Sequence, residues 1–413
     1  MRILHVNKFL YRRGGAEAYM LDLATLQARA GHQVEFFAMA HPDNLPARFA
    51  DRFPAHIELE PPPPSLSGQL HGAGRVLWST SARRGMTQVV EDFAPDVVHR
   101  LNVYHQLSPS VLDPLRRLGI PAVMTLHDYK LACPSYQFLD HGSPCQACLD
   151  GGFRQAVRRR CKGGSLAASA LCATESWLHR RAGAYGPVHC FVCPSRFLAG
   201  RMARAGVFPD RLRWVPHFVE VEKLEPKTEA GGDVVFAGRL SAEKGVDTLI
   251  AAIGRLRPTA TLQVAGEGPE GSRLQALADD LAPGRVVFHG RLGKADTVAL
   301  LRSAAVVAVP SRWYENQPMI VLEAMALGVP VVASDMGGLP ELVEPDVTGA
   351  LVPPDDDEAL AAALAGLLDD PGRALAMGQA GRAEVAWSHS PELHLERLGD
   401  IYREAGAPLE VTV

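Results

Sequence analysis

Residues 315–323 read ENQPMIVLE, and this stretch decides the fold once the segments around it are included. FAGRLSAEKG occupies 236–245, VAGEGP occupies 264–269, and GGLPELV follows at 337–343. These glycine-containing segments alternate with short apolar runs, which is typical of β-strands that lead through turns into helices. Strands that alternate with helices in this way predict a parallel sheet with helices on both faces.

Two basic residues stand in the turn after the strand predicted at 234–237. Arg239 offers a planar fork of donors and Lys244 a compact charge, and both suit phosphate oxygens. The chain has only seven lysines against thirty-five arginines, so a lysine in a glycine-flanked turn is informative. Pro318 suits the first position of a helix, and the free N–H groups of residues 316–320 would then form a cradle for anions and hydroxyls.

Two glutamates flank the start of this predicted helix. Glu315 stands at its mouth, and Glu323 lies two turns further along. Carboxylates at these places can accept hydrogen bonds from sugar and ribose hydroxyls. Glutamates eight positions apart usually face solvent, but the four segments occur in the order and at the spacing of consecutive strand–helix units. Together they predict a site for a sugar attached to a diphosphate.

The C-terminal half resembles the donor domain of the retaining glycosyltransferases of family 4, which have the GT-B fold. The resemblance rests on the Gly-Arg-Leu and Glu-Lys-Gly turn, the Gly-x-Gly strand end, the two glutamates with seven residues between them, and LEAMALGVPV at 322–331. It implies that Arg239 and Lys244 hold the diphosphate, that Glu323 binds the ribose, and that Glu315 contacts the transferred sugar. It further implies donor contacts from Gly238, Gly266, Leu292, Asn316, Gln317, Met319 and Ile320, of which Leu292 lies where the family meets the nucleobase.

The N-terminal half begins with an apolar strand at 2–6, a helix at about 14–30, and a second strand within 31–37. Gly14 and Gly15 allow the backbone to approach a ligand closely. The pair is not a GxGxxG fingerprint, so a nicotinamide site is disfavoured. In the family that the chain resembles, this glycine loop faces the donor phosphate, and the resemblance implies the same contact for both glycines.

Polar residues follow two further predicted strands. His127 comes directly after the apolar run 122–126, at the carboxyl end of a strand, where open α/β sheets bind ligands. A single histidine is more often structural, but the resemblance implies a hydrogen bond from this one to the sugar near its reacting carbon. The predicted catalytic residues are therefore His127, Arg239, Lys244 and Glu315. The candidate rim of the acceptor pocket, at the end of the preceding strand, is formed by His99, Asn102 and Tyr104.

The length of 413 residues predicts two domains of ordinary size. With the resemblance, the predicted fold is α/β of the GT-B kind, with two Rossmann-like parallel-sheet domains that face each other across a cleft. The expected parts are an acceptor-binding domain at 1–219 with a cysteine-containing insertion at 128–165, a linker at 220–232, a nucleotide-sugar donor-binding domain at 233–386, and a C-terminal helix at 387–413 that returns to the first domain. Four prolines at 61–64 predict a stiff surface connection.

Four of the seven cysteines lie in this insertion: Cys133, Cys145, Cys148 and Cys161. A Cys-x2-Cys pair with two flanking cysteines can enclose a tetrahedral zinc ion, and the metal would stabilise a segment with too little apolar content for its own core. Free buried thiols and redox-labile pairs are the alternatives, whereas disulfides are disfavoured in a cytosolic chain with an odd number of cysteines. The other three, Cys172, Cys190 and Cys193, are predicted to lie in the core.

Charge divides sharply along the chain. Residues 1–219 hold 26 Lys+Arg and 16 Asp+Glu, a net charge of +10, and the remainder holds 16 and 30, a net charge of −14, which together give −4. A basic first domain fits an anionic partner, either an acidic membrane surface or a lipid-pyrophosphate saccharide. A solvated arginine-rich face is the alternative, and the lack of interleaved aromatic residues argues against nucleic acid.

No run of eighteen uncharged apolar residues predicts a membrane span, and the first residues enter a strand directly rather than a signal peptide. These features favour a cytoplasmic protein, with peripheral binding at the inner membrane face as a further expectation.

The predicted function is transfer of a sugar, with retention of configuration, from a nucleotide-diphosphate sugar to a saccharide or lipid-linked acceptor in polysaccharide or glycoconjugate biosynthesis. UDP- and GDP-sugars are the expected donors, and no cofactor is expected for catalysis. No residue is placed as a covalent nucleophile, so we expect same-face attack by the acceptor hydroxyl, with Arg239 and Lys244 stabilising charge on the departing phosphate. Two alternatives stay open: another GT-B sugar enzyme such as a phosphorylase or an epimerase, and a non-catalytic nucleotide-sugar-binding or scaffold protein.

Overall fold

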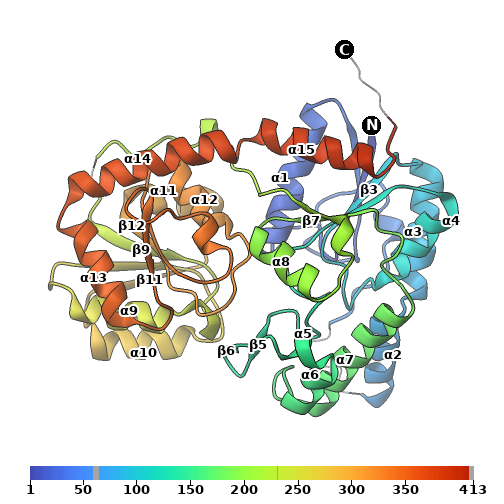
Figure 1. Cartoon of the computed structure of the whole chain (residues 1–413), viewed down its shortest axis with the longest axis horizontal. Helices are drawn as coiled ribbons and strands as arrows, with labels where there is room; N and C mark the ends of the chain where they lie inside the picture. The colour runs from blue at the N-terminus through green and yellow to red at the C-terminus, as the bar shows by residue number, and fades with distance from the viewer. Residues whose placement is uncertain (59–64, 230, 409–413) are drawn as a thin grey trace. The chain divides into compact units, whose positions relative to one another are not determined.

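The structure is a computed structural model of the chain, and it describes residues 1–58, 65–229 and 231–408. The proline run at 61–64 therefore lies outside the described residues. The chain forms two compact units (Figure 1). The first unit contains residues 1–138, 146–215 and those from Leu395 onward, and the second contains 139–145 and 216–394. The change of unit between Val215 and Pro216 comes just before the linker predicted at 220–232.

The first unit is built on a six-stranded parallel sheet with the order β2-β1-β3-β4-β7-β8. Every residue of β3, β4 and β7 is buried, as expected when helices cover both faces of a parallel sheet. The chain passes from β1 to β2 on one side and continues with β3 on the other side of β1. The strands are β1 (Arg2–Val6), β2 (Gln33–Phe37), β3 (Val97–Arg100), β4 (Ala122–Thr125), β7 (Cys190–Cys193) and β8 (Leu212–Trp214).

Helices of the first unit begin at polar caps that the sequence supplies. Ser65, Ser79, Ser165 and Ser195 each accept a hydrogen bond from the backbone N–H three residues further on. The helices are α1 (Gly15–Arg29), α2 (Leu66–Leu77), α3 (Thr80–Phe93), α4 (Leu112–Leu118), α5 (Ala147–Gly151), α6 (Arg154–Arg159), α7 (Leu166–Arg181) and α8 (Arg196–Arg204), with 3-10 turns at Ala50–Arg52, Pro109–Val111 and Pro209–Arg211. The last helix, α15 (Pro391–Glu404), belongs to this unit from Leu395 onward.

The second unit repeats the plan with a six-stranded parallel sheet in the order β11-β10-β9-β12-β13-β14. Its strands are β9 (Asp233–Ala237), β10 (Leu262–Ala265), β11 (Val286–Gly290), β12 (Ala304–Val309), β13 (Val331–Ser334) and β14 (Gly349–Val352). The short antiparallel hairpin of β5 (Leu139–Asp140) and β6 (Ser143–Pro144) is grouped with this unit. Its helices are α9 (Val246–Arg255), α10 (Gly271–Leu281), α11 (Lys294–Ser303), α12 (Met319–Ala326), α13 (Asp357–Leu368) and α14 (Pro371–Ser388), with 3-10 turns at Val221–Lys223, Ala242–Lys244 and Leu339–Glu341.

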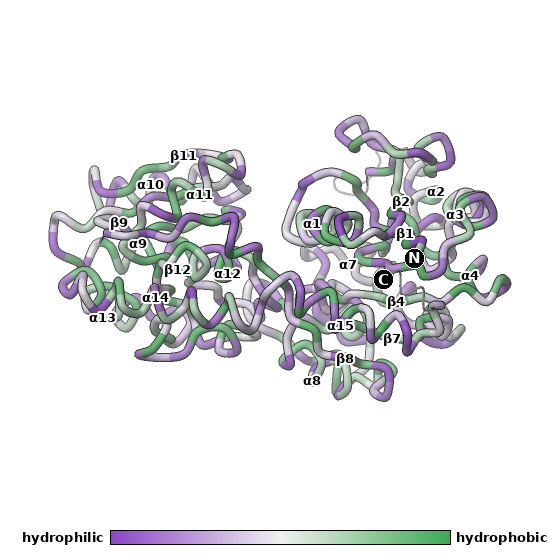
Figure 2. Tube along the Cα trace, turned by 90° about the horizontal axis from the view of Figure 1, so that it is seen from above, coloured by the Kyte–Doolittle hydropathy of each residue, from purple (hydrophilic) through white to green (hydrophobic). Residues whose placement is uncertain are grey.

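The core of the second unit lies on both faces of its sheet. Val234 and Phe236 of β9 join one hydrophobic cluster, and Val235 between them joins the other. Alternate strand residues point to opposite faces, so both faces of this sheet are covered by helices. In Figure 2, much of the tube around α12 and β12 has the hydrophobic colour, whereas several outer turns have the hydrophilic colour.

The predicted α/β class with two Rossmann-like parallel sheets is confirmed. The helix predicted at about 14–30 is α1, which begins and ends within one residue of that range. Cys172, Cys190 and Cys193 are buried, as predicted. Over the described residues, no helix combines the length and apolar character needed to cross a bilayer.

Candidate active site

Three loops at the carboxyl ends of β9, β10 and β11 interlock through their backbones. The N–H of Gly238 donates to Ala265 at 2.9 Å, and the N–H of Gly266 donates to Gly290 at 2.7 Å. Gly266 has φ +142°, and a Cβ there would lie 1.8 Å from the carbonyl oxygen of Gly238. Only glycine permits this approach, so the Gly-x-Gly motif is required to bring the loops together.

The loops after β9 and β12 bring Lys244 and Glu315 together. β9 and β12 are neighbours although two strand–helix units separate them in sequence, so the strand order reverses here. Gly245 has φ +66°, and a Cβ there would lie 2.0 Å from the carbonyl oxygen of Pro310. The resulting close contact places the Lys244 ammonium 2.7 Å from Oε1 of Glu315. Such switch points are where open α/β sheets bind ligands.

Glu315 is held in place from several directions. It is 5% exposed, and its Oε1 accepts a hydrogen bond from Ser311 at 2.6 Å. Its backbone carbonyl accepts from Gly338 at 2.7 Å, and Gly337 beside it could carry no Cβ, which would lie 2.3 Å from the same oxygen. Burial alone would raise the pKa of Glu315, but the Lys244 charge and the hydrogen bonds from Lys244 and Ser311 lower it below its usual value. Glu315 is therefore a fixed, ionised acceptor.

The two predicted phosphate-binding cations differ in their surroundings. The Lys244 side chain is 22% exposed, and its ammonium also lies 5.3 Å from the ring centre of Trp313. Arg239 is exposed, and within the described part of the chain its guanidinium makes no hydrogen bond or ion pair. The loop after β9 thus presents one uncommitted guanidinium and one partly neutralised ammonium, a pair suited to binding an oxyanion.

The helix predicted to start at Pro318 is α12, which begins one residue later with Pro318 as its cap. The first N–H groups of a helix have no acceptor within it, so this end carries partial positive charge beside Glu315. Glu323 lies in the second turn and is half-buried. Met319 and Ile320 pack against the hydrophobic core.

Gln317 has a structural contact that the sequence did not indicate. Its buried side chain accepts a hydrogen bond from the backbone N–H of His217 at 2.5 Å, and its Nε2 lies 3.1 Å from Nε2 of His389. The side chain thus ties the start of the second unit to the end of α14. Of the other predicted donor residues, Asn316 follows β12 and Leu292 follows β11, and both are half-buried.

In the first unit, the loops after β1 and β3 are joined at the point where the strand order reverses. Asn7 accepts from the backbone N–H of Asn102 at 3.1 Å and donates to the buried Glu17 at 3.2 Å. Gly14 caps α1, and both it and Gly15 are exposed. The backbone at this helix start is consequently open to a ligand, as the glycine pair predicts.

His127 stands at the carboxyl end of β4 with its Nε2 atom shielded from solvent. Burial lowers the pKa of His127 to about 3, so its imidazole is neutral at pH 7 and can donate one hydrogen bond. Tyr19 packs edge-on against the ring at 5.2 Å. Burial also raises the pKa of Asp128 to about 6, although the N–H of Lys130 donates to it and Lys8 and Lys130 lower the value. Asp128 was not among the predicted site residues, although it follows His127 at the same strand end.

His99 is a correction to the predicted acceptor rim. It is fully buried, and its two ring nitrogens lie 2.7 Å from the hydroxyls of Tyr402 and Thr125. No ring nitrogen is left for an acceptor, because this position of β3 points into the layer beneath α15. Tyr104 is buried with its hydroxyl enclosed, and Asn102 is half-buried.

Two family models match the chain: "Glycosyltransferase Family 4" over residues 13–223 and "Glycosyl transferases group 1" over residues 221–384. The first match alone covers more than half of the chain. The chain belongs to glycosyltransferase family 4. The motifs at Arg239, Lys244, Glu315 and Glu323 all fall within the second match.

Two relatives show how far this family 4 chain resembles known proteins. It is 42% identical over 172 residues to a GDP-mannose-dependent monoacylated alpha-(1-6)-phosphatidylinositol monomannoside mannosyltransferase of Corynebacterium glutamicum, which is 40% of this chain and 45% of the relative. It is 31% identical over 371 residues to an alpha-maltose-1-phosphate synthase of Mycolicibacterium smegmatis, which is 82% of this chain and 86% of the relative. The matched stretch spans about half the length of the corynebacterial relative and of several others.

Solved structures agree with the GT-B fold of this family 4 chain. Sucrose-phosphate synthase from Thermosynechococcus elongatus superposes with a TM-score of 0.72 at 21% identity, covering 98% of each chain. The Anabaena protein Alr3699/HepE, solved with UDP, superposes with a TM-score of 0.66 at 19% identity, covering 97% of this chain and 99% of that one. At these identities the likeness establishes the fold.

The four cysteines of the insertion do not form a ready metal site in this family 4 chain. Cys133, Cys148 and Cys161 belong to the first unit, and Cys133 turns its sulfur to Ser135 at 3.2 Å. Within the described residues, the one group of three or more candidate ligands is His105, Cys172 and Glu175. The Lys130 ammonium lies 2.7 Å from the carboxylate of Glu175. The positive charge next to this group is therefore supplied by a lysine side chain.

Proposed function

We propose that the protein is a retaining, metal-independent glycosyltransferase that uses a nucleotide-diphosphate sugar. The observation that carries the proposal is the Lys244–Glu315 pair at the reversal point of the second sheet, beside the uncommitted Arg239. A diphosphate needs cationic donors and a sugar needs a fixed hydrogen-bond acceptor, and these residues supply both.

In this mechanism, Arg239 and Lys244 bind the diphosphate and stabilise the charge that develops as it leaves the sugar. Glu315 accepts a hydrogen bond from a sugar hydroxyl, and Glu323 accepts from the ribose. Neutral His127 donates to the sugar. Glu315 is hydrogen-bonded to Lys244 and Ser311, which argues against its acting as a covalent nucleophile. The acceptor hydroxyl therefore attacks from the face of the leaving phosphate, which takes the proton.

UDP- and GDP-sugars are the candidate donors. The corynebacterial relative is named as GDP-mannose-dependent, and the Anabaena neighbour was solved with UDP. We propose a saccharide or lipid-linked acceptor in polysaccharide or glycoconjugate assembly, because the corynebacterial relative acts on a phosphatidylinositol mannoside. The net charge of +10 on residues 1–219 supports peripheral binding at the cytoplasmic face of a membrane.

A panel of UDP-, GDP- and ADP-sugars, each assayed by thermal shift and by slow donor hydrolysis, tests the proposal. A ligand at 100 times its Kd adds about 2.7 kcal/mol of stability, which a melting curve resolves. One donor should stabilise the parent, and Lys244→Ala should lose both this effect and the hydrolysis. Lys223→Ala is the matched control, because Lys223 lies on the surface of the same unit and, among the described residues, forms an ion pair with Glu220 alone. Stabilisation without hydrolysis or transfer would indicate a binding protein, and no stabilisation by any sugar would refute the donor site.

Zinc at Cys133, Cys145, Cys148 and Cys161 stays a prediction. It requires the sulfurs to move together, since metal binding and local folding are coupled. Metal analysis of the purified protein should find one equivalent of zinc in the parent and less in Cys148→Ser, with Cys190→Ser as the buried control. Equal metal content in all three proteins would rule out a site at these cysteines.

A further inference from the structure

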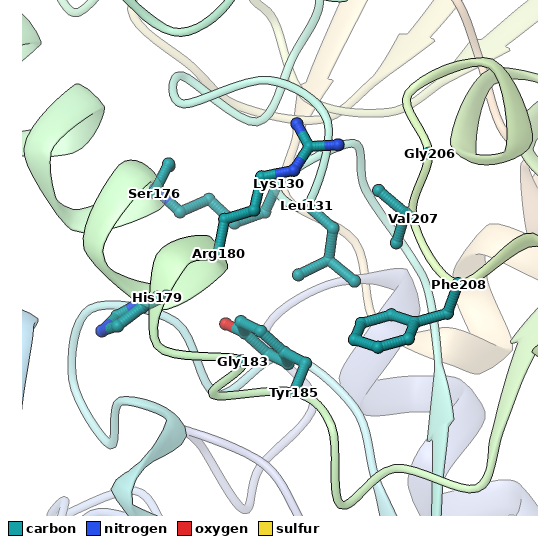
Figure 3. Close-up of a pocket in the computed structure, with 10 residues that line it drawn as sticks. All are labelled: Lys130, Leu131, Ser176, His179, Arg180, Gly183, Tyr185, Gly206, Val207 and Phe208. Carbon is teal, nitrogen blue, oxygen red and sulfur yellow. The ribbon is translucent and has the colours of Figure 1, made fainter.

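A cavity of about 270 Å³ lies within the first unit, against the end of α7 (Figure 3). The loop after β4, the last turns of α7 and the loops that precede β7 and β8 line it. Its volume is close to the lower end of the range for small-molecule sites, about 300–1,000 Å³. Since a cavity of about 150 Å³ holds benzene, this one has room for about ten carbon atoms.

Most of the cavity wall is apolar. Leu131, Val207 and Phe208 contribute aliphatic and aromatic side chains, and Tyr185 contributes its ring. Figure 3 shows Leu131, Tyr185 and Phe208 directed toward the same space. Val207 and Tyr185 are buried, and Leu131 and Phe208 are half-buried. An apolar group that enters this space leaves water for an apolar surrounding, which favours its binding.

The buried end of the cavity offers no uncommitted charge. Lys130 is 3% exposed, and its ammonium donates to Glu175 at 2.7 Å and to the carbonyl oxygen of Pro134 at 3.0 Å. The charge of Lys130 is thus balanced by Glu175. Ser176 adds a neutral hydroxyl, which is buried and has no hydrogen-bond partner in the described part of the chain. This end therefore suits the neutral part of a ligand.

The open end of the cavity carries a cation. Arg180, Gly183 and Gly206 are exposed, so the cavity reaches solvent beside them. The Arg180 guanidinium donates to the carbonyl oxygen of Ala205, and its carbon lies 5.6 Å from the ring centre of Phe153. Among the described residues it forms no ion pair. Most of its N–H donors are consequently available to an anion at the mouth of the cavity.

The neighbouring face of α7 is both apolar and basic. Ser176 and Arg180 are four positions apart and share the face that lines the cavity. On the adjacent face, Trp177 is 57% and Leu178 is 38% exposed, and the exposed Arg181 follows four and three positions later. Tryptophan and leucine beside arginine on an exposed helix are typical of surfaces that meet lipid head groups.

We propose that this cavity binds the chain of a single anionic amphiphile, with about ten carbons inside it and the head group paired with Arg180. A phosphate or carboxylate fits the planar guanidinium, and an alkyl or prenyl chain fits the apolar wall. A free phosphate ion would leave the wall unfilled, and a neutral hydrocarbon would leave the guanidinium without an anion. The site does not depend on the proposed function, because none of the predicted donor residues lines the cavity.

A series of alkyl phosphates from butyl to dodecyl, each kept below its critical micelle concentration, measures this site by calorimetry. The parent should bind one equivalent, with an affinity that rises about fourfold for each added methylene up to about ten carbons and little beyond. Melting curves should show a matching stabilisation. Binding of many equivalents, or an affinity that does not depend on chain length, overturns the proposal without the need for any variant.

Two substitutions test the two ends of the ligand. Leu131→Trp fills the cavity and should weaken binding of decyl phosphate about tenfold or more, because it displaces several methylenes. Leu118→Trp on the exposed surface of α4 is its control and should bind as the parent does. Arg180→Met should weaken decyl phosphate about fivefold or more and leave binding of uncharged octanol unchanged. Arg181→Met removes the same charge beside the cavity and should retain the affinity of the parent.

Decyl phosphate that binds Leu131→Trp or Arg180→Met as tightly as the parent refutes the site. Vesicles containing phosphatidylglycerol then separate two sources of the amphiphile. Vesicle binding that Leu131→Trp loses indicates a membrane lipid, and vesicle binding that is equal in both proteins indicates a soluble amphiphile. Donor binding keeps this proposal distinguishable from the proposed function: Leu131→Trp should retain donor stabilisation and lose decyl phosphate, and Lys244→Ala should show the opposite pattern.

Discussion

Replacing Lys244 by methionine tests the charge balance on which the donor site depends. The substitution leaves Glu315 almost completely buried and still bonded to Ser311, but without its counterion. Removing one partner of a buried ion pair costs about 3–5 kcal/mol, and losing an exposed pair costs about 0–1 kcal/mol. The Glu315 side chain is 6% exposed and that of Lys244 is 22% exposed, so the pair lies between these cases. We expect a loss of about 2–3 kcal/mol, which is about 5–10 °C in the melting temperature of a unit of this size.

The pH dependence of this loss has a definite sign. In the parent, the pKa of Glu315 is lowered, so its ionised form contributes stability above its unfolded pKa and loses it as pH falls. Without Lys244, burial is the main remaining influence and raises the pKa of Glu315. The ionised form then destabilises the fold at neutral pH, and protonation relieves the cost. The difference between parent and variant should therefore shrink as pH falls from 7 toward 4.

Chemical unfolding at several pH values measures the loss of stability and its pH dependence. The proteins compared are the parent, Lys244→Met, Glu315→Gln and the double variant. The double variant should recover much of the stability lost in Lys244→Met, because no unpaired charge remains. Turnover should stay at least about tenfold below the parent in all three variants, since the phosphate or the sugar loses a preorganised partner. Equal stability of parent and Lys244→Met, or a loss that grows as the pH is lowered, would refute the charge-balance argument.

Three further substitutions test individual positions. Gly266→Ala should remove donor-induced stabilisation and lower the melting temperature strongly, since its Cβ would lie 1.8 Å from the carbonyl oxygen of Gly238; a variant that binds donor normally would contradict the interlocked loops. Asp128→Asn should stabilise the protein at pH 7.5, because a carboxylate whose pKa is raised to about 6 destabilises the fold above that pH. Melting curves should show this gain in stability shrinking as the pH falls toward 4. His99→Phe should cost about 1–3 kcal/mol in chemical unfolding because it removes the hydrogen bonds to Tyr402 and Thr125, although Gln27 still donates to Tyr402, and donor stabilisation should be retained. A stable variant with weakened acceptor use would restore His99 to the acceptor site.

The sequence predicted the donor loops because their cause is local. A glycine that must accept a positive φ, or a backbone contact closer than a Cβ allows, leaves a visible trace in the sequence, as at Gly245 and Gly266. Carboxyl ends of parallel strands share one edge, so polar residues placed there could be assigned to one site. That Lys244 would touch Glu315 could not be predicted, because the contact depends on β9 and β12 being neighbours.

Distant partners explain the positions that the sequence could not resolve. His99 and His127 both follow apolar runs, and the pattern alone gives them the same role. The difference lies in Tyr402, which is 303 residues from His99 and occupies one of its ring nitrogens. Gln317 likewise lies inside the decisive motif, yet its side chain is held by His217 and His389, 100 and 72 residues away. Side-chain roles set by such contacts require the fold to be known first.

The contrast between Arg239 and Lys244 links phosphate binding to sugar recognition. The Arg239 guanidinium has no partner within the described residues and can donate to a phosphate without losing a contact, whereas Lys244 must share its charge between the phosphate and Oε1 of Glu315. As the diphosphate draws the ammonium away, the same oxygen of Glu315 becomes available to a sugar hydroxyl, which is the donor it then needs. A nucleoside diphosphate without its sugar would draw on Lys244 and leave the buried Glu315 less well satisfied. On the proposed mechanism, the complete nucleotide sugar should therefore stabilise the second unit more than the nucleoside diphosphate does, and Glu315→Gln should narrow that difference.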